Sequence, residues 1–349
     1  MVLQGDSVEW YSSTFPGAPS EETLGGVRIV RSGRQWTVHW SAFRHYQGKL
    51  AGNFDVVVDE INTIPFFTPL WADIPVVAFI HQLAREVWWY ESPFPLSALG
   101  FFAEPLYLRA YRRVPAITVS ESTKLDLTNL GFVGPMTVLP EGLEPLTVSS
   151  VTRPAHPTFL YAGRLAPSKR VSDVIRAFAA FDKSSDRGEL RLLGDGRPEY
   201  IRALHKLARD LGVSERVRFL GRISRERKHM EMAGAHMLLL ASAREGWGLV
   251  VIEANAFGTP AVAYDVPGLR DSIRHEKTGL LVRPSPEALA GSMIRLWSDS
   301  SLYERLATGA KAWSVTFSFE NTAIVFRHAI SGVLNGRLLE RQRDGGGGG

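Results

Sequence analysis

The chain has 349 residues, a hydrophobic content of 45%, a net charge of +4 and no cysteine. This length and apolar content predict two compact domains, since one domain commonly takes roughly 150 residues. The lack of cysteine excludes disulfides and thiolate chemistry and is typical of a reducing compartment.

Several other classes of protein are not expected. No apolar run is long enough to span a bilayer and the N-terminus lacks the features of a signal peptide, so we expect a cytoplasmic protein. The mild positive charge suits a phosphate-bearing ligand or an anionic membrane surface. A nucleic-acid partner is not expected, because the arginines are dispersed and no nucleic-acid motif accompanies them. The nine histidines lack ligand spacing and no Asp-x-Asp pair follows a strand, so we expect no metal and no other cofactor.

Apolar runs in the first half of the chain predict buried strands. These runs lie at residues 55–59, 75–81, 114–120 and 137–143.

Three polar residues at or near the ends of these strands are candidates for a site. His81 ends the second strand, and ligands of open parallel sheets bind beyond the carboxyl ends of strands; a lone histidine elsewhere is more often structural. Ser120 either belongs to the acceptor side of a site or caps the next helix. Glu141 either contacts a ligand hydroxyl or is a turn residue.

Aromatic residues crowd the segment between residues 83 and 107, and Arg109, Arg112 and Arg113 follow it. One hypothesis is an apolar wall that receives a lipid-linked or aromatic acceptor, with the arginines near anionic headgroups of a membrane. The alternative is ordinary packing of the core or of a subunit interface. The sequence leaves both open.

The second half of the chain alternates strand and helix patterns, which predicts a doubly wound parallel sheet. A stretch rich in Thr, Ser and Pro at residues 145–157 is expected to link the two domains. The predicted units are an N-terminal domain over residues 1–144, a C-terminal domain over 158–316, a terminal helix over 317–338 and a flexible tail over 339–349.

Two groups of residues in the C-terminal domain have the chemistry to bind a phosphate-bearing ligand. Arg164 and Lys169 follow the strand at 158–163, where a diphosphate would meet them. Glu245 and Glu253 flank a glycine-containing turn into a helix, whose free N–H groups favour a phosphate. Each group alone could be a solvated surface feature.

Taken together, these motifs resemble family 4 glycosyltransferases of GT-B fold. The resemblance rests on five motifs in order: Gly163-Arg164-Leu165 with Lys169, Gly194-Asp195-Gly196, the Glu245/Glu253 pair, Gly258-Thr259-Pro260 and Val266-Pro267-Gly268. It implies two Rossmann-like domains that face each other across a cleft. It also implies metal-independent transfer of a sugar, with retention of configuration, from a UDP- or GDP-linked donor to a hydroxyl acceptor.

The resemblance further implies a role for individual residues. Arg164 and Lys169 would bind the donor diphosphate, Glu253 the ribose and Glu245 the donor sugar. The chain after Glu245 would contact the sugar and the phosphate, through Gly246, Trp247, Gly248 and Leu249. His81 would reach the reaction centre from the N-terminal domain.

The N-terminus departs from the family pattern. Relatives begin with a strand, a glycine-rich loop and a helix before the segment that here starts at Val8, and only Met1 to Ser7 precede it. We therefore expect a truncated N-terminal domain, a rearranged sheet, or a gap filled by another chain. One alternative function is a nucleotide-sugar binding protein with lost transfer activity, and another is a phosphorylase or epimerase that shares the fold.

Overall fold

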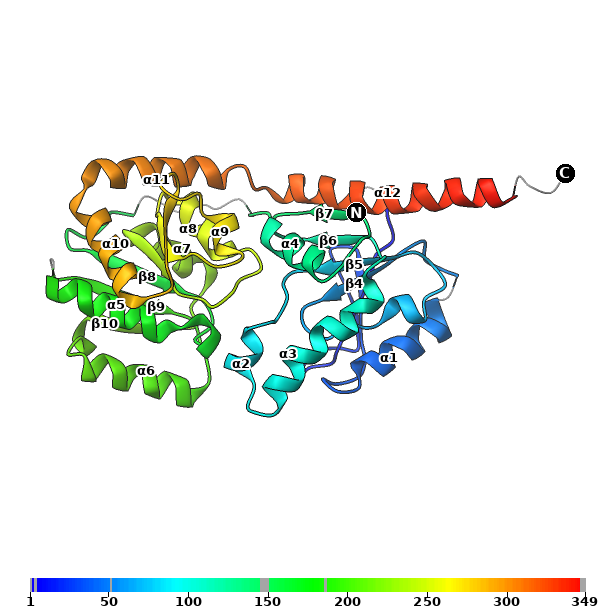
Figure 1. Cartoon of the computed structure of the whole chain (residues 1–349), viewed down its shortest axis with the longest axis horizontal. Helices are drawn as coiled ribbons and strands as arrows, with labels where there is room; N and C mark the ends of the chain where they lie inside the picture. Colours follow the sequence, from blue (N-terminus) through cyan, green and yellow to red (C-terminus); the bar gives the residue numbers. More distant parts are fainter. Residues whose placement is uncertain (1, 3–4, 51, 145–150, 185–186, 346–349) are drawn as a thin grey trace.

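The computed structural model describes residues 2, 5–50, 52–144, 151–184 and 187–345, without the side chains of 49–50 and 337–345. The chain forms two α/β halves joined by a long C-terminal helix (Figure 1). The expected linker at 145–157 lies partly outside the described residues, since 145–150 are not among them.

The described strands are β1 Glu9–Ser12, β2 Glu21–Leu24, β3 Val27–Arg31, β4 Val57–Ile61, β5 Val76–Ile80, β6 Ala116–Thr118, β7 Met136–Val138, β8 Thr158–Ala162, β9 Glu189–Leu193, β10 Val217–Gly221, β11 Met237–Leu240, β12 Ala261–Tyr264 and β13 Gly279–Val282. The described α-helices are α1 Val38–His45, α2 Val87–Glu91, α3 Leu96–Tyr107, α4 Glu121–Asn129, α5 Val171–Ser184, α6 Pro198–Asp210, α7 Arg225–Gly234, α8 Leu249–Ala256, α9 Leu269–Ser272, α10 Pro286–Ser298, α11 Ser300–Ser314 and α12 Phe319–Gly345.

The C-terminal half is built on a parallel six-stranded sheet in the order β10-β9-β8-β11-β12-β13. From β8 the chain adds β9 and β10 on one side, and it then returns to add β11 to β13 on the other. Strand order therefore reverses between β8 and β11. In open parallel sheets this reversal leaves a crevice at the carboxyl ends of the two strands, where ligands bind.

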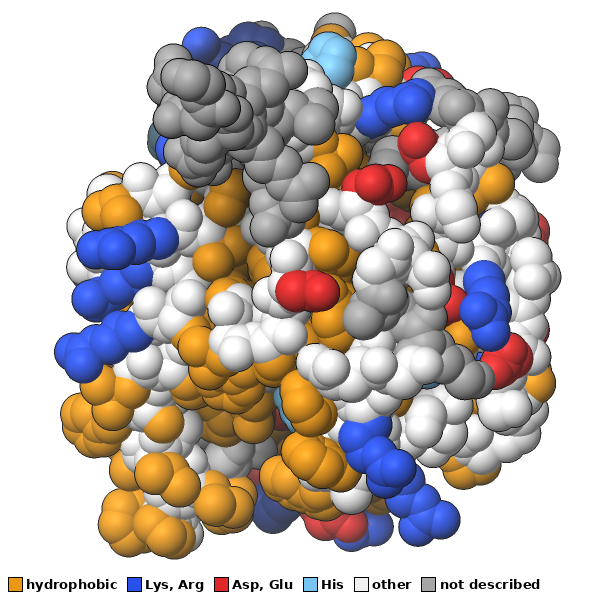
Figure 2. Space-filling view, turned by 90° about the vertical axis from the view of Figure 1, so that its right-hand side faces the viewer, with side chains coloured by type: hydrophobic (Ala, Val, Ile, Leu, Met, Phe, Trp, Pro, Cys, Tyr) orange, Lys and Arg blue, Asp and Glu red, His pale blue; other side chains and the backbone are white. Residues whose placement is uncertain are grey.

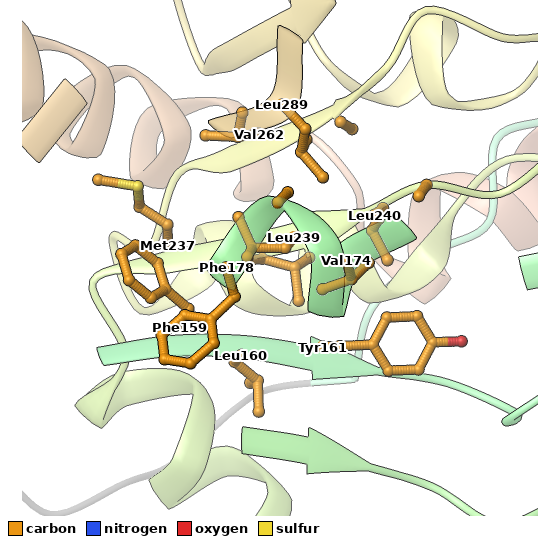
Figure 3. Packing of buried hydrophobic residues seen from close by; sticks show 14 of the residues in the cluster. Phe159, Leu160, Tyr161, Val174, Phe178, Met237, Leu239, Leu240, Val262 and Leu289 are labelled. Carbon is orange, nitrogen blue, oxygen red and sulfur yellow. The ribbon is translucent and has the colours of Figure 1, made fainter. Parts of the chain in front are cut away.

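Apolar side chains from this sheet and its helices form the largest core of the molecule. The β8 strand is buried along its whole length, because helices cover both sides of it. Figure 3 shows Phe159 of β8 beside Phe178 of α5, with ring centroids 6.0 Å apart. A strand packed this tightly gives the residues that follow it a fixed position.

The N-terminal half holds a parallel four-stranded sheet in the order β4-β5-β6-β7. Its strands agree with the four predicted ones within a few residues. A separate three-stranded sheet, β1-β3-β2, lies closer to the N-terminus and was not predicted. Its strands are four or five residues long and include charged residues such as Glu9, Glu21 and Arg28, so they lack a continuous apolar run.

Helix α12 crosses from the C-terminal half onto the N-terminal half (Figure 1). Ile330 packs into a small core with Val77 of β5 and Ile117 of β6. The hydroxyl of Thr322 donates a hydrogen bond to the carbonyl oxygen of Pro140 at 3.1 Å. The chain therefore ties its last helix to the sheet that carries His81. In the part of the chain that the structure describes, no helix has the length and apolar character needed to cross a bilayer.

Candidate functional site

A cavity of about 370 Å³ opens where strand order reverses, between the two halves. It begins directly after β8, at Gly163 and Arg164, and directly after β11, at Ser242. The N-terminal half contributes Asn62, His81, Gln82 and Glu141. Polar side chains from two separate sheets thus meet around one volume that is large enough for a small ligand.

Lys169 and Glu245 form an ion pair inside this cavity. The Lys169 ammonium nitrogen lies 2.7 Å from each carboxylate oxygen of Glu245, and the Ser242 hydroxyl donates to one of those oxygens at 2.7 Å. Both side chains of the pair are about four-fifths buried. A buried, charge-assisted pair of this kind is short and well ordered, so the cation and the carboxylate hold defined positions.

The loop after Glu245 brings backbone close to the opposite half of the molecule. A Cβ atom on Gly246 would lie 2.8 Å from the carbonyl oxygen of His81, which is too close for any side chain. Gly248 has a φ of +88°, in the left-handed region that favours glycine, and it is the N-cap of α8. Leu249, the first residue of α8, lines the cavity, so the positive end of the helix faces it.

A second cavity of about 420 Å³ adjoins the first and shares Leu249 with it. Glu253, one turn further along α8, lines this second cavity, and its carboxylate lies 2.6 Å from the ammonium of Lys228. The rest of the wall is mostly apolar, formed by Leu143, Leu193, Ile223 and Phe319 among others. Glu245 and Glu253 therefore serve two neighbouring compartments on either side of the start of α8.

His81 lies between two carboxylates on the N-terminal side of the first cavity. Its Nε2 atom is 3.0 Å from Glu60, its Nδ1 atom is 3.5 Å from Glu141, and its ring stacks on Phe79. Burial lowers the pKa of His81, but the hydrogen bonds to Glu141 and Glu60 outweigh it and raise the pKa from 6.5 to about 9. At neutral pH the ring is therefore cationic and donates from both nitrogens, so it is not a general base.

Arg164 extends from the end of β8 toward α2 of the opposite half. Its guanidinium is 3.5 Å from Glu91, and the hydroxyl of Ser168 also donates to that carboxylate. The hydroxyl of Tyr161 donates to the Arg164 carbonyl at 2.8 Å, which fixes the backbone of this turn. The Arg164 side chain is 60% exposed, so it can reorient toward an anion in the cavity.

Polar contacts close the two halves around the site. Arg244 is only 8% exposed and lies 2.9 Å from Glu86 and 2.5 Å from Asp126, which both belong to the N-terminal half. Asp271 of α9 accepts a hydrogen bond at 3.0 Å from the backbone N–H of Ser122 in α4. Because Arg244 directly precedes Glu245, its ion pairs also fix the position of the loop that runs from Glu245 to α8.

The structure brings most of the sequence-predicted residues together. One cavity is lined by His81, Glu141, Arg164, Lys169, Glu245, Gly246, Trp247, Gly248 and Leu249, and the adjoining cavity by Glu253. Trp247 is only 5% exposed and packs on Phe317, with ring centroids 5.3 Å apart, so most of its ring supports the loop.

Ser120 is a correction. It is fully buried and does not line either cavity. Its hydroxyl accepts from the backbone N–H of Thr123 at 3.2 Å, which makes it the N-cap of α4. Of the two interpretations that the sequence left open, the geometry supports the helix cap.

Sequence reasoning missed four residues that the geometry adds. Glu60 and Glu91 come from the N-terminal half and pair with site residues, while Ser242 and Lys228 pair with the two predicted glutamates. Lys228 and Glu91 lie in helices without a recognisable motif, so only their contacts in the folded chain show that they belong to the site. Ser242 directly follows a predicted strand, and that position was the available signal.

Comparison with known proteins gives a consistent result. Residues 148–313 match the family model described as glycosyl transferases group 1. An exopolysaccharide phosphotransferase of Streptomyces coelicolor is 37% identical over 235 residues, or 64% of this chain and 24% of that protein. D-inositol 3-phosphate glycosyltransferases of Nocardia farcinica and Rhodococcus erythropolis are 36% and 30% identical, over 52% and 72% of this chain and 42% and 61% of those proteins. The chain thus spans less than two thirds of the length of these relatives.

Solved structures confirm the expected GT-B fold. Sucrose-phosphate synthase from Thermosynechococcus elongatus superposes with a TM-score of 0.76 at 21% identity, covering 99% of this chain and 91% of that one. Anabaena Alr3699/HepE in complex with UDP and glucose superposes with a TM-score of 0.69 at 19% identity, covering 88% of this chain and 86% of that one. At such identities the likeness concerns the fold alone.

Proposed function

We propose that the chain transfers a sugar from a nucleoside-diphosphate donor to an acceptor hydroxyl, a proposal supported by the match of residues 148–313 to the model of group 1 glycosyl transferases. The observation that carries the proposal is the pair of adjoining cavities at the strand-order reversal, which meet at the start of α8. The first carries Arg164 and Lys169, whose charges suit a sugar diphosphate. The second combines apolar side chains with two ion-paired carboxylates, Glu144 and Glu253, which suits a nucleoside.

The donor diphosphate binds between Arg164, Lys169 and the N-terminus of α8. Lys169 is ion-paired with Glu245. The donor sugar hydroxyls that donate hydrogen bonds to Glu245 therefore lie beside the phosphate that Lys169 neutralises. Glu253 accepts hydrogen bonds from the ribose hydroxyls in the second cavity, and the ion pair with Lys228 orients its carboxylate. In this proposal the reacting sugar carbon lies in the first cavity, which His81 lines from the N-terminal half.

In the proposed reaction, the bond between the sugar and the diphosphate oxygen breaks and the nucleoside diphosphate leaves with the electron pair. The acceptor oxygen forms the new bond on the same face of the sugar and gives its proton to the departing phosphate oxygen, so configuration is retained. Negative charge grows on the diphosphate, and the cations around it lower the barrier without a metal. Cationic His81, which is hydrogen-bonded to Glu60 and Glu141, places a positive charge on the N-terminal side of the cavity.

The relatives and structural neighbours bear on the substrates. The Anabaena neighbour is described in complex with UDP and glucose, which favours a UDP-linked donor over a GDP-linked one. Relatives named D-inositol 3-phosphate glycosyltransferase favour a hydroxyl acceptor.

Calorimetric titration with UDP, GDP and ADP tests the donor site. We expect saturable binding of one of them, weakened at least about tenfold by Arg164→Ala and by Glu253→Ala, since each removes a charged contact. Arg202→Ala, an exposed change on α6, is the matched control. Absence of binding in a folded protein contradicts the donor site.

Incubation with UDP- and GDP-sugars then separates transfer from binding. Release of nucleoside diphosphate, with the sugar on an acceptor or on water, supports a transferase. Binding without turnover over a broad panel of acceptors would identify a nucleotide-sugar binding protein instead, and recovery of an isomerised sugar nucleotide would identify an epimerase.

A further inference from the structure

Helix α3 carries its large apolar side chains on the outside. The exposed residues, each between 56% and 67% accessible, are Leu96, Leu99, Phe102 and Leu106. The residues that α3 buries are Ser97, Gly100 and Glu104. The exposed residues recur every three or four positions, so they share one face of the helix. A helix that packs on a core and faces water shows the opposite pattern.

The apolar surface continues onto α2 and the loop between the helices. Phe94 is 81% exposed, and Trp89 and Tyr90 are 48% and 39% exposed. Trp89 packs on Phe101, which packs in turn on Phe102, with ring centroids 5.6 Å and 5.3 Å apart. We call this continuous surface of α2, α3 and their loop the α3 face. Contiguous apolar surface of this kind marks an interaction site, whereas scattered single residues do not.

The α3 face is basic beyond the C-terminal end of α3, while the two carboxylates at α2, Glu86 and Glu91, pair with Arg244 and Arg164 of the other half. Residues 92–113 contain one acidic residue, Glu104, and its buried carboxylate accepts from the backbone N–H groups of Ala84 and Arg85 at 2.6 Å and 2.7 Å. The exposed charges of this segment are those of Arg109 and Arg113, just beyond the C-terminal end of α3. Figure 2 views the molecule from the N-terminal half and shows hydrophobic side chains gathered at the lower left, with basic side chains above them; acidic and basic side chains both lie toward the lower right.

The α3 face adjoins the cleft. Glu91, the last residue of α2, follows Tyr90 directly and is the carboxylate that meets Ser168 and Arg164 of the site. Whatever covers the α3 face therefore lies next to the entrance of the cavity.

We propose that the α3 face docks on an anionic lipid bilayer. Tryptophan and tyrosine prefer the interface between water and lipid, leucine and phenylalanine enter the acyl boundary, and arginines attract anionic headgroups. A second copy of this chain fits less well, since a twofold contact through this face would bring two equally basic surfaces together. Docking does not depend on the proposed transfer reaction, but it would present the cleft to acceptors at the membrane surface.

Co-sedimentation with vesicles tests docking directly. The full chain is mixed with vesicles of phosphatidylcholine alone or of phosphatidylcholine with phosphatidylglycerol. We expect binding to the anionic vesicles, reduced at least about tenfold by Leu99→Ser with Phe102→Ser, because two apolar side chains leave the lipid. Arg109→Glu with Arg113→Glu is expected to weaken it by well over fivefold, since each basic residue near such a surface contributes about that factor.

Matched controls keep the outcome specific. Leu125→Ser with Val133→Ser changes two exposed apolar residues outside the α3 face, and Arg202→Glu reverses one exposed charge in the other half; both should bind vesicles as the unaltered chain does. Equal melting temperatures and equal nucleotide binding show that the variants are folded.

The proposal is overturned if the unaltered chain leaves anionic vesicles unbound, or if the serine and glutamate variants bind as well as their controls. Light scattering that finds a dimer, dissolved by Leu99→Ser with Phe102→Ser, would also overturn it in favour of self-association. Nucleotide binding is measured separately, so failure to dock is distinct from failure of the donor site.

Discussion

At the residue scale, the protonation of His81 is the most directly testable feature of the site. Its pKa lies above the ordinary 6.5, at about 9, because two carboxylates stabilise the cation. The charged form therefore stabilises the folded chain fully below pH 6.5, and that contribution is lost as the pH rises through about 9. If cationic His81 assists transfer, the reaction rate should fall over the same range.

Titration of isotope-labelled histidine by NMR checks this prediction. Glu60→Gln and Glu141→Gln should each lower the pKa of His81, since each removes one negative partner. Glu199→Gln, an exposed change on α6, should leave it in place. A His81 resonance that titrates near pH 6.5 in the unaltered chain would contradict the proposed pairing of His81 with Glu60 and Glu141.

Lys169 gives a second prediction at this scale. Lys169→Ala should weaken binding of a nucleoside diphosphate by about tenfold to a hundredfold, because a hydrogen bond to a charged group contributes about 1.5–3 kcal/mol. Lys169→Arg should restore part of the affinity, since the charge returns with a different shape. Calorimetry with Lys206→Ala, an exposed lysine of α6, as control measures the difference, and unchanged affinity would remove Lys169 from the diphosphate site.

The sequence-predicted residues that line the first cavity share one property, namely a position just after a strand or at a helix start. His81, Arg164 and Glu245 occupy such positions, and the parallel topology alone brings them to one edge. Glu60 and Lys228 were missed because their importance comes from a partner 21 and 25 residues away. No local pattern encodes a contact of that kind.

At the scale of elements, the loop from Glu245 to α8 depends on glycine at its closest approach to the other half. Gly246→Ala would place a Cβ atom 2.8 Å from the His81 carbonyl, so one of the two backbones must move. We expect the free energy of unfolding to fall by roughly 1–3 kcal/mol, which lowers the melting temperature, and we expect weaker nucleotide binding.

Gly291→Ala is the matched control for this change. Gly291 lies within α10 and a Cβ atom there meets nothing within 4 Å, so alanine should stabilise the helix by about 0.5–1 kcal/mol. If Gly246→Ala also raised the melting temperature and preserved binding, the close approach of the two halves would be wrong.

Strands were predictable mainly where apolar residues dominate, even where one charged residue interrupts the run, as Arg218 does in β10. The buried strands β8 and β11 are almost entirely apolar, whereas β1 to β3 are four or five residues long and mix charged with apolar residues, so they gave no signal. The aromatic segment allowed two interpretations, and the structure divides it: Leu83 is buried in the core, while Phe102 is exposed. Periodicity shows which residues share a face, but not whether that face points inward.

At the scale of the whole molecule, the GT-B arrangement followed from motif order, but the contacts between the halves did not. Pairs such as Arg244 with Glu86 and Asp126 join residues 158 and 118 positions apart. Their geometry depends on how two separately folded units pack against each other, and no local pattern in a single sequence predicts that packing.

Arg244 provides the prediction that belongs to this scale. Arg244→Ala removes a nearly buried cation that two N-terminal carboxylates share, so the halves should separate more easily. Small-angle X-ray scattering should show a larger radius of gyration, and the melting temperature should fall. The donor residues all lie in the C-terminal half, so nucleotide affinity should change much less than transfer, which needs both halves. Arg270→Ala breaks an exposed pair with Asp265 within one half and should leave the scattering unchanged. If Arg244→Ala scatters like Arg270→Ala, closure rests instead on the remaining contacts, which include the Asp271 to Ser122 hydrogen bond and the docking of α12.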